Sequence, residues 1–252
     1  MVQVAVVTGT SRGIGLEFTR QLLAREPRVR VVAAARRPAA SQELAALQRQ
    51  HGPAWLTLVA LDLASQESIQ AAAEEVACAC PDGVDILINN AGVLGSHDLA
   101  SETTSEDLEA VLRVNVIGTL ALTRALLPLL RKGASKTVVN LSSGAGAISA
   151  AGGQGGWALR SLAYKSSKAA LNMATVLLAR ELRPEGFIVV PVTPGWVATD
   201  LGNSTADLAG PLGPRPTLDA AASVRQMLTL LERLRPEDSG AFVNYDGRRL
   251  EW

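Results

Sequence analysis

A tyrosine and a lysine four positions apart, Tyr164 and Lys168, are the residues whose types best suit proton transfer. In a helix, positions i and i+4 share one face, so the phenol and the ammonium can point into one cleft. A free tyrosine has a pKa of about 10, and a nearby ammonium favours the phenolate and lowers that pKa. Because an exposed helix face can carry the same spacing, the pair predicts acid–base chemistry only together with other polar groups.

Polar side chains also follow two apolar, strand-like runs. The run Val138–Leu141 ends in Ser142 and Ser143, and Asn89–Gly92 follows an earlier run. In a doubly wound sheet, ligands bind at the carboxyl ends of the strands, so we expect these groups to face one cleft. Asn115 lies within an apolar helical segment, where exposure on the helix surface is the simpler interpretation.

A glycine-rich segment lies between the first apolar run and the first helical pattern. Gly9 allows a tight turn, Gly13 lets the backbone approach a pyrophosphate, and Gly15 lets a helix pack closely on the strand. The helix N-terminus would offer free N–H groups and the positive end of its dipole to phosphates. The sequence therefore predicts a dinucleotide site that includes Gly9, Ser11, Arg12, Gly13, Ile14 and Gly15.

The end of the second predicted strand indicates which dinucleotide binds. A dehydrogenase that uses NAD usually places an acid there to accept hydrogen bonds from the ribose 2′-hydroxyl. Here the chain reads Ala33-Ala34-Ala35-Arg36-Arg37, with no acid. Arg36, aided by Arg12, would bind a 2′-phosphate through charge-assisted hydrogen bonds, whereas Arg37 fits a solvated turn equally well. We therefore expect NADPH/NADP+ as the cofactor.

The elements that must position these groups alternate along the chain. Short apolar runs predict strands at Val4–Thr8, Val29–Ala34, Leu56–Leu61, Ile86–Asn89, Thr137–Leu141, Ile188–Val192 and Ala241–Val243. Helical periodicity predicts helices at Ile14–Ala24, Gln42–Gln50, Gln66–Ala77, Ser105–Leu130, Ala163–Leu182 and Leu218–Leu234. Strands that are apolar throughout are typical of a parallel sheet covered on both faces. We predict an α/β fold, a Rossmann-type doubly wound parallel β-sheet of about seven strands flanked by helices.

No break in composition divides the chain, so we expect residues 1–252 to form a single domain. Its cofactor-binding part would cover about residues 1–140. The segment Gly202–Pro216, rich in Gly, Pro and Ser, is expected to be a mobile loop over the substrate.

Composition and charge exclude several classes of function. Hydrophobic residues make up 48% of the chain, enough for a large core. Lys plus Arg equal Asp plus Glu at 24 each, so no global field attracts nucleic acid or an anionic membrane. The longest apolar run, Val116–Leu130, contains Arg124 and Pro128 and is shorter than the roughly 20 residues that span a bilayer.

Compartment and metal content follow from the N-terminus, the cysteines and the histidines. The N-terminal segment reads as a buried strand and not as a signal peptide. Cys78 and Cys80 lie two positions apart on a predicted helix and point in different directions, and His51 and His97 are far apart. We therefore expect no metal site and a reducing compartment, most simply the cytoplasm.

Together these motifs resemble those of the short-chain dehydrogenase/reductase family, whose pattern is Thr-Gly-x3-Gly-x-Gly, Asn-Asn-Ala-Gly, an Asn within a helix, a Ser, and Tyr-x3-Lys. The matching positions are Thr8–Gly15, Asn89–Gly92, Asn115, Ser143, Tyr164, Lys168 and Pro194-Gly195. The match spans essentially the whole chain. Any one of these motifs is weak evidence alone, but all of them in this order are highly specific. Gly155-Gly156-Trp157 and the ending Gly240–Gly247, closing on Trp252, resemble the branch that contains C-factor and the fly carbonyl reductase sniffer.

The resemblance implies a role for each matching residue. Tyr164 would be the general acid, and Lys168 would lower its pKa and bind the nicotinamide ribose. Ser143 would donate a hydrogen bond to the substrate oxygen, and Asn115 would position a water in a proton relay. The remaining cofactor contacts would be Asp62 and Leu63 near the adenine, Asn89, Ala91 and Gly92 along the adenosine, and Pro194, Gly195, Val197 and Thr199 at the nicotinamide carboxamide.

One spacing departs from the family pattern. Tyr164 follows Ser143 by 21 positions, which is longer than usual, and the intervening residues are rich in Gly and Ala. They could loop out beside the cleft. The departure leaves Ser142 as an alternative to Ser143 and does not affect the assignment of Tyr164 and Lys168.

The resemblance implies an NADPH-dependent oxidoreductase that reduces a ketone, aldehyde or quinone to an alcohol by hydride transfer. A substrate pocket formed by Ser143–Trp157 and the Gly202–Pro216 loop would be largely apolar, because Asp207 and Arg215 are its only charged candidates. The alternative is an NADPH-binding regulatory or sensor protein with little or no turnover. Such proteins commonly lose the Tyr or the Lys, and this chain keeps both. An epimerase or dehydratase is a weaker interpretation, because those relatives are usually longer.

We expect the protein to bind a small-molecule carbonyl substrate. We expect it to bind neither nucleic acid nor a membrane. By resemblance, the long helices Ser105–Leu130 and Ala163–Leu182 would pair in a homodimer or homotetramer. Their apolar faces could equally pack on the sheet.

Overall fold

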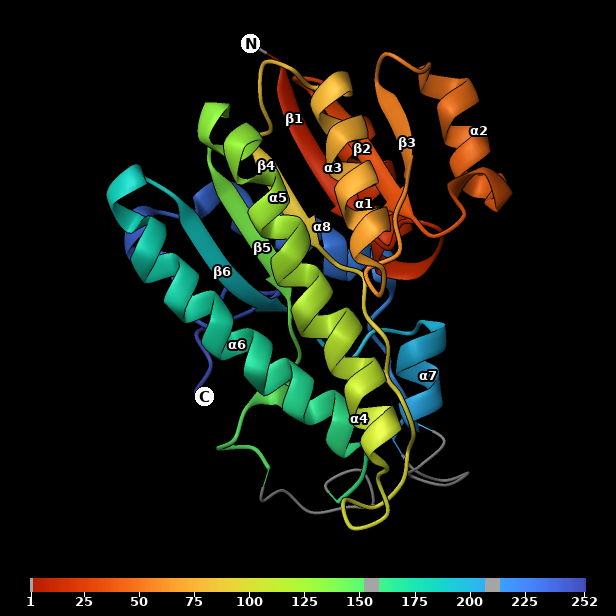
Figure 1. The fold of residues 1–252 in the computed structure, drawn as a ribbon, viewed down its shortest axis with the longest axis vertical. Coiled ribbons are helices and arrows are strands. Elements are labelled where there is room, and N and C mark those ends of the chain that lie inside the picture. The colour runs from red at the N-terminus through yellow and green to blue at the C-terminus, as the bar shows by residue number, and fades with distance from the viewer. Residues whose placement is uncertain (1, 152–158, 207–213) are drawn as a thin grey trace.

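The computed structural model describes residues 2–151, 159–206 and 214–252. Its centre is one sheet of parallel strands in the order β3-β2-β1-β4-β5-β6-β7 (Figure 1). The strands are β1 (Gln3–Thr8), β2 (Val29–Ala35), β3 (Leu56–Ala60), β4 (Ile86–Asn89), β5 (Thr137–Leu141), β6 (Ile188–Thr193) and β7 (Val243–Asn244). The strand order reverses between β1 and β4, which opens a crevice at their carboxyl ends.

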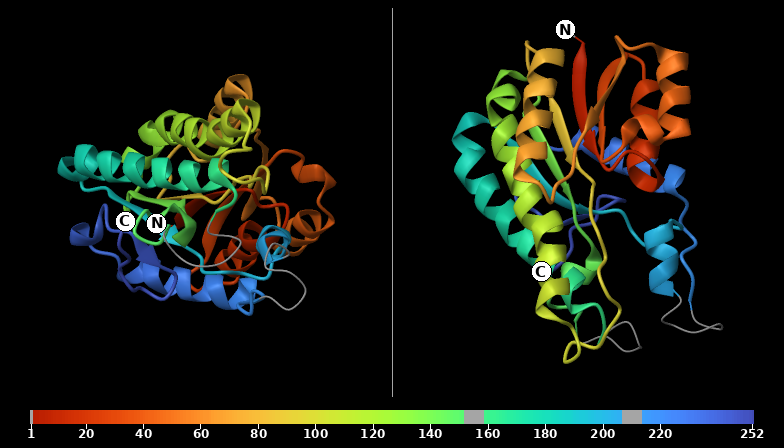
Figure 2. Two further views of the ribbon diagram at one scale, coloured as in Figure 1. Left: turned by 90° about the horizontal axis from the view of Figure 1, so that it is seen from below. Right: turned by 45° about the vertical axis from the view of Figure 1, so that its right-hand side comes forward.

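Helices cover both faces of the sheet (Figure 2). One face is covered by α1 (Gly13–Leu23), α2 (Gln42–His51) and α8 (Ala220–Arg233), and the other by α3 (Gln66–Ala79), α5 (Thr119–Lys132) and α6 (Leu162–Leu182). The predicted Rossmann-type doubly wound α/β fold is confirmed, with seven strands in the described part of the chain.

The strands form the buried layer because they are apolar without alternation. Along β1, Val6 packs on the side of α3, α5 and α6, whereas Ala5 and Val7 pack on the side of α1, α2 and α8. A strand covered in this way has no solvent face, which is why its sequence shows no period of two. β4 and β5 have the predicted bounds, and β1, β2, β3 and β6 differ by one residue at one end. The predicted strand Ala241–Val243 overlaps β7 only at Val243.

The predicted helix Ser105–Leu130 is continuous but not uniformly α-helical. A π-helical turn, Arg113–Gly118, joins α4 (Ser105–Leu112) to α5 and carries Asn115. Such turns are frequent at functional sites. By length and composition alone, Ser105–Lys132 could cross a membrane. In the fold its buried side chains, Leu122 and Leu126 among them, belong to the core on this face of the sheet.

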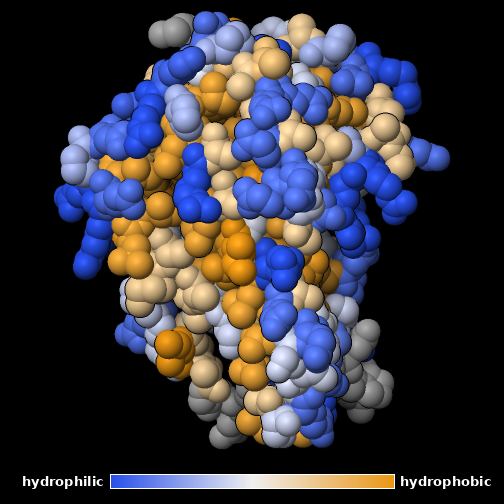
Figure 3. Space-filling view, in the orientation of Figure 1, coloured by the Kyte–Doolittle hydropathy of each residue, from blue (hydrophilic) through white to orange (hydrophobic). Residues whose placement is uncertain are grey.

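Part of the apolar surface of these long helices does not pack on the sheet. Ile117 in the π-helical turn is 61% exposed, and Met173 and Leu177 on α6 are 62% and 57% exposed. Figure 3 shows apolar surface on the face that α5 and α6 present. The pairing of these helices between two chains stays a prediction.

A helix that the sequence did not predict, α7 (Asp200–Ala206), occupies the start of the expected loop. The Thr199 hydroxyl accepts a hydrogen bond from the N–H of Gly202 at 3.2 Å, and the helix begins directly after Thr199. This cap outweighs the low helix propensity of one glycine. Residues 207–213 of the loop, and residues 152–158 with Trp157, lie outside the described residues.

We expect Gly118→Ala to destabilise the fold, because α5 begins against the backbone that follows β3. A Cβ at position 118 would lie 2.0 Å from the carbonyl oxygen of Leu63, so the backbone would have to move. Overpacking of this kind costs about 1–3 kcal/mol of unfolding free energy, which chemical denaturation measures. The control is Gly144→Ala, whose Cβ meets nothing within 4 Å. An equal loss in the control would contradict the explanation.

Candidate active site

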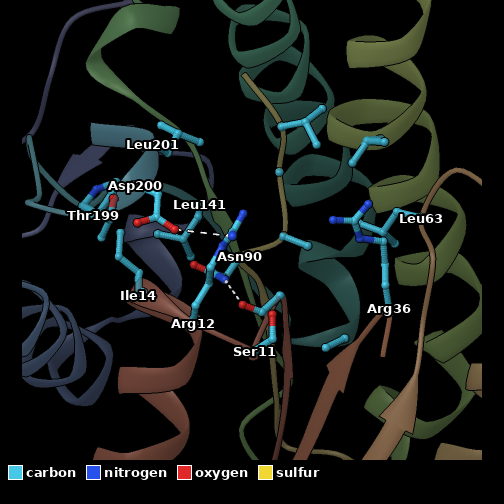
Figure 4. A pocket seen from close by; sticks show the side chains of 18 of the residues that line it. Ser11, Arg12, Ile14, Arg36, Leu63, Asn90, Leu141, Thr199, Asp200 and Leu201 are labelled. Atoms are coloured by element: carbon cyan, nitrogen blue, oxygen red, sulfur yellow. Dashed lines mark hydrogen bonds and ion pairs between the residues drawn. The ribbon is translucent and has the colours of Figure 1, made fainter. Parts of the chain in front are cut away.

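A cleft of about 620 Å³ opens at the carboxyl ends of β1, β2, β4 and β5. The predicted site residues that line it are Gly9, Ser11, Arg12, Gly13, Ile14, Arg36, Asp62, Leu63, Ala91, Gly92, Tyr164, Lys168, Pro194 and Thr199. Lining residues that sequence reasoning missed include Asn90, Val93, Leu141 and Asp200. Figure 4 shows this cleft from close by, with strands and helices from both halves of the sheet around it.

The glycine-rich turn between β1 and α1 is shaped by close backbone contacts. Gly9 and Gly13 have positive φ angles of 72° and 56°, which other residues rarely adopt. A Cβ on Gly9 would lie 2.8 Å from the Cα of Ala91, and one on Gly15 would lie 2.3 Å from the carbonyl oxygen of Gly9. A Cβ on Gly13 would meet only Thr199, no closer than 3.5 Å. The N-terminus of α1 therefore remains open to the groove, where its N–H groups suit phosphate oxygens.

The two arginines at the cleft lie apart and have different surroundings. Arg36 follows β2 and lies beside Leu63, and it makes no hydrogen bond or ion pair with any described residue (Figure 4). Arg12 Nη1 lies 3.4 Å from Asp200 Oδ2, and both side chains are largely exposed. Arg12 therefore joins the glycine-rich turn to α7. This leaves Arg36 as the cation available at the end of β2.

Tyr164, Lys168 and Ser143 come together where α6 packs on the end of β5. Tyr164 and Lys168 are buried, with 8% and 4% of their surfaces exposed. The Tyr164 side chain is hydrogen-bonded to the side chain of Ser143. Lys168 Nζ lies 5.7 Å from the centre of the Tyr164 ring and donates a hydrogen bond to the carbonyl oxygen of Leu141 at 2.7 Å. The predicted acid–base pair thus has a hydroxyl partner.

The pKa values of this pair follow from burial. Burial raises the pKa of the Tyr164 phenol, and the hydrogen bond with Ser143 acts against this rise. Burial lowers the pKa of Lys168 to about 8. The expectation that the ammonium lowers the pKa of Tyr164 is not met in this structure, because Lys168 Nζ faces the ring and the Leu141 carbonyl. A raised phenol pKa keeps Tyr164 protonated at neutral pH.

Asn115 is buried beneath the cleft and not exposed on a helix surface. Its side chain donates to the Val93 carbonyl at 2.8 Å and to Ser167 Oγ at 2.9 Å, and accepts from the Val93 N–H at 2.8 Å. Only 1% of Asn115 is exposed. It fixes the backbone after Gly92 at the cleft wall, and its part in a proton relay stays a prediction.

Several predicted residues do not line the cleft. The Asn89 side chain is buried beneath the sheet and donates to Thr123 Oγ1 at 3.0 Å and to Asn140 Oδ1 at 2.8 Å. Its neighbour Asn90 lines the cleft instead, because alternate side chains point to opposite sides of an extended backbone. The others that do not line the cleft are Gly15, Asn115, Ser143, Gly195 and Val197. Ser142, the alternative to Ser143, does line it.

The described residues contain no group of three or more His, Cys, Asp or Glu side chains that could hold a metal ion. His97 contacts Ser161 Oγ through Nδ1 at 3.2 Å, near the start of α6. Among the described polar groups at the cleft are Arg12, Arg36, Tyr164 and Lys168.

Comparisons with known proteins agree with this geometry. The family model described as short chain dehydrogenase matches residues 3–208. The C-signal protein of Myxococcus xanthus is 42% identical over 173 residues, which cover 69% of this chain and 95% of that protein. The NADPH-bound carbonyl reductase from chicken fatty liver superposes with a TM-score of 0.90 at 36% identity, covering 100% of this chain and 94% of the other. The carbonyl reductase Sniffer of D. melanogaster has a TM-score of 0.86 at 29% identity, with both chains covered fully.

We expect Lys168→Met to stabilise the protein near neutral pH, with a gain that shrinks as the pH rises. The folded protein holds the Lys168 proton with a pKa of about 8, against an ordinary value of 10.5, so the unfolded chain binds more protons between these values. Below about pH 8 the buried charge therefore lowers the unfolding free energy of the wild type by at most about 3 kcal/mol. This loss disappears towards pH 10.5, because Lys168 is then neutral in the folded protein.

The measurement is the difference in unfolding free energy between variant and wild type across this pH range. Lys132→Met, at the exposed end of α5, controls for the removal of one lysine. A difference between Lys168→Met and wild type that stays constant with pH would show that burial of the charge is not the cause.

Proposed function

The chain belongs to the short-chain dehydrogenase family, and on this premise we propose that it is an NADPH-dependent oxidoreductase that reduces a carbonyl group to an alcohol. The single observation that supports this most strongly is the meeting of Ser143, Tyr164 and Lys168 beside the glycine-rich turn. Tyr164, the proposed proton donor, lines the same cleft as the glycine-rich turn that would bind the phosphates, and Ser143 is its hydrogen-bond partner.

The residues of the cleft fit NADPH. Gly13 and the N-terminus of α1 would hold the pyrophosphate, and Arg36 at the end of β2, where there is no acid, would bind the 2′-phosphate. Asp62 and Leu63 border the part of the cleft next to Arg36, as expected for the adenosine side. When bound, the cofactor supplies the hydride that is added to the carbonyl carbon. The chicken carbonyl reductase, which this structure matches closely, is NADPH-bound.

The chain's own residues would handle the carbonyl oxygen. Tyr164, kept protonated by its raised pKa, would transfer its proton to the oxygen as the carbon gains hydride, so C=O becomes CH–OH. Ser143 would donate a hydrogen bond to the same oxygen, where negative charge develops. The Lys168 ammonium would stabilise the phenolate left on Tyr164 and bind the nicotinamide ribose.

The substrate class is a ketone, aldehyde or quinone with an apolar body. The apolar side chains that line the cleft include Val93, Leu141 and Leu201. Apolar side chains with few convergent polar groups are typical of sites for small apolar ligands. We expect the protein in the cytoplasm, because Cys78 and Cys80 are both unpaired thiols.

A regulatory function is the second candidate, since one relative is named C-signal and not an oxidoreductase. The two candidates differ in turnover. NADPH consumption against a panel of ketones, aldehydes and quinones, with NADPH titration alongside, separates them. Turnover of any member establishes the reductase, and tight NADPH binding without turnover throughout the panel favours the regulatory function.

Tyr164→Phe should remove turnover while leaving NADPH affinity nearly unchanged. The variant keeps the ring and loses the proton donor, and general acid catalysis contributes a factor of about 100 to 10,000. Steady-state kinetics measure the loss, and titration measures the NADPH Kd. Tyr245→Phe, the same change at the other tyrosine, is the matched control and should retain activity. Turnover by Tyr164→Phe comparable to wild type would falsify the proposed mechanism.

Arg36→Asp should shift preference from NADPH towards NADH. The change removes the cation that faces the 2′-phosphate and adds an acid for a 2′-hydroxyl, so we expect the ratio of kcat/KM values to fall about 100-fold. Arg37→Asp changes the net charge equally, but Arg37 does not line the cleft, so its ratio should stay near the wild-type value. Equal shifts in both variants would indicate a general charge effect and refute the role of Arg36.

A further inference from the structure

Three side chains at four-residue spacing on α6 contact consecutive residues at the end of β5. Tyr164 is hydrogen-bonded to Ser143, and Lys168 donates to the carbonyl of Leu141. Asn172, one further turn along, accepts a hydrogen bond from Ser142 Oγ at 2.6 Å. The helix face that carries Tyr164 and Lys168 is therefore hydrogen-bonded to residues 141–143, where β5 ends.

Asn172 holds this strand end on both sides of Ser143. Its Oδ1 accepts from Ser142, the residue before Ser143, and its Nδ2 donates to the carbonyl of Gly146, three residues after it, at 3.5 Å. Asn172 and Ser142 are 2% and 3% exposed, so both depend on each other for a hydrogen-bond partner. Removal of either leaves the other buried and short of one bond.

The turn after Ser143 needs such a support. Ser143 is extended, with φ −158° and ψ 148°, and a 3₁₀ turn, Gly144–Gly146, follows it. A Cβ on Gly146 would lie 2.8 Å from the backbone of Lys168, so the turn packs directly on α6. Ser143 itself is only partly buried, and its Oγ accepts a hydrogen bond from the Ala145 N–H at 3.1 Å. Little else fixes its hydroxyl against Tyr164 among the described residues.

We propose that Asn172 and Ser142 form a positioning pair that holds the Ser143 hydroxyl at the Tyr164 phenol. This inference rests on the proposed function, because it gives the pair a task in carbonyl reduction. Asn172 does not line the cleft, and it acts through Ser142. The pair also favours Ser143 over Ser142 as the substrate-binding hydroxyl. Ser142 lines the cleft, but its hydroxyl donates to Asn172, whereas the Ser143 side chain is hydrogen-bonded to Tyr164.

Kinetics of Asn172→Leu, Ser142→Ala and the double variant test the pair. Misplacing a catalytic group by a fraction of an ångström costs about tenfold in kcat, so each single variant should lose about that factor. In Asn172→Leu the substrate KM and the NADPH Kd should stay within about twofold, because Asn172 does not line the cleft. The double variant should lose no more than the worse single variant, because the two changes break one interaction.

Thr175→Val is the matched control for loss of a buried hydrogen bond. Thr175 lies one turn further along α6, is fully buried, and accepts from Asn140 Nδ2 at 2.9 Å. It makes no hydrogen bond to residues 142–146. The control should lose stability to a similar extent and keep its kcat. An equal loss of kcat in the control would overturn the proposal.

A second measurement does not depend on turnover. The chain has only two tyrosines, so ¹³C-labelled tyrosine gives two ring signals, and Tyr164→Phe assigns them. The Cζ signal of Tyr164 should shift in Asn172→Leu and in Ser142→Ala, and stay in place in Thr175→Val. If the wild type turns over no carbonyl compound, the proposed function fails while this signal still tests the pair. An unmoved Tyr164 signal in both variants would overturn the positioning role.

Discussion

The packing of α6 on the end of β5 buries an ammonium group, and the arrangement of the site depends on that contact. Burial of a charge is costly unless the group finds partners. Lys168 Nζ meets the carbonyl of Leu141 at 2.7 Å, and its pKa falls to about 8. An apolar residue at this position would stabilise the fold better near neutral pH. Perturbed pKa values of this kind cluster at functional sites, which fits the proposed role of Lys168 in binding a ligand in the cleft.

The two ends of the cleft are built on different principles. At the phosphate end, backbone geometry dominates, because Gly9 and Gly13 adopt positive φ angles and the N-terminus of α1 is left open. At the proposed catalytic end, the buried side chains of Tyr164 and Lys168 dominate, and both lie on α6. The parallel sheet brings the two ends together, since the turn after β1 and the end of β5 lie at the same edge. Arg12 and Asp200 add a surface ion pair between that turn and α7.

The sequence predicts what depends on local pattern and on parallel strand order. β4 and β5 have their predicted bounds because apolar runs without alternation belong to covered strands. The motifs identified in the sequence correctly predicted that most of the candidate site residues line the cleft. The π-helical turn at Asn115, the inward orientation of Asn89 and the pairing of Arg12 with Asp200 were not predictable, because each depends on tertiary contacts that no local pattern encodes. The hydrogen bond from Ser142 to Asn172 on the opposite helix was likewise not predictable from the sequence.

A buried polar ladder explains how the two long helices hold their positions relative to the strands. Thr123 on α5 accepts from Asn89 on β4, Asn89 donates to Asn140 on β5, and Asn140 donates to Thr175 on α6. Apolar contacts tolerate sliding of a helix along a sheet, but a hydrogen bond fails when its atoms shift by a fraction of an ångström. The ladder therefore fixes both helices in register with β4 and β5. The Ser142–Asn172 hydrogen bond, and not this ladder, contacts the residue next to Ser143, so loss of a single ladder bond lowers stability without moving the Ser143 hydroxyl.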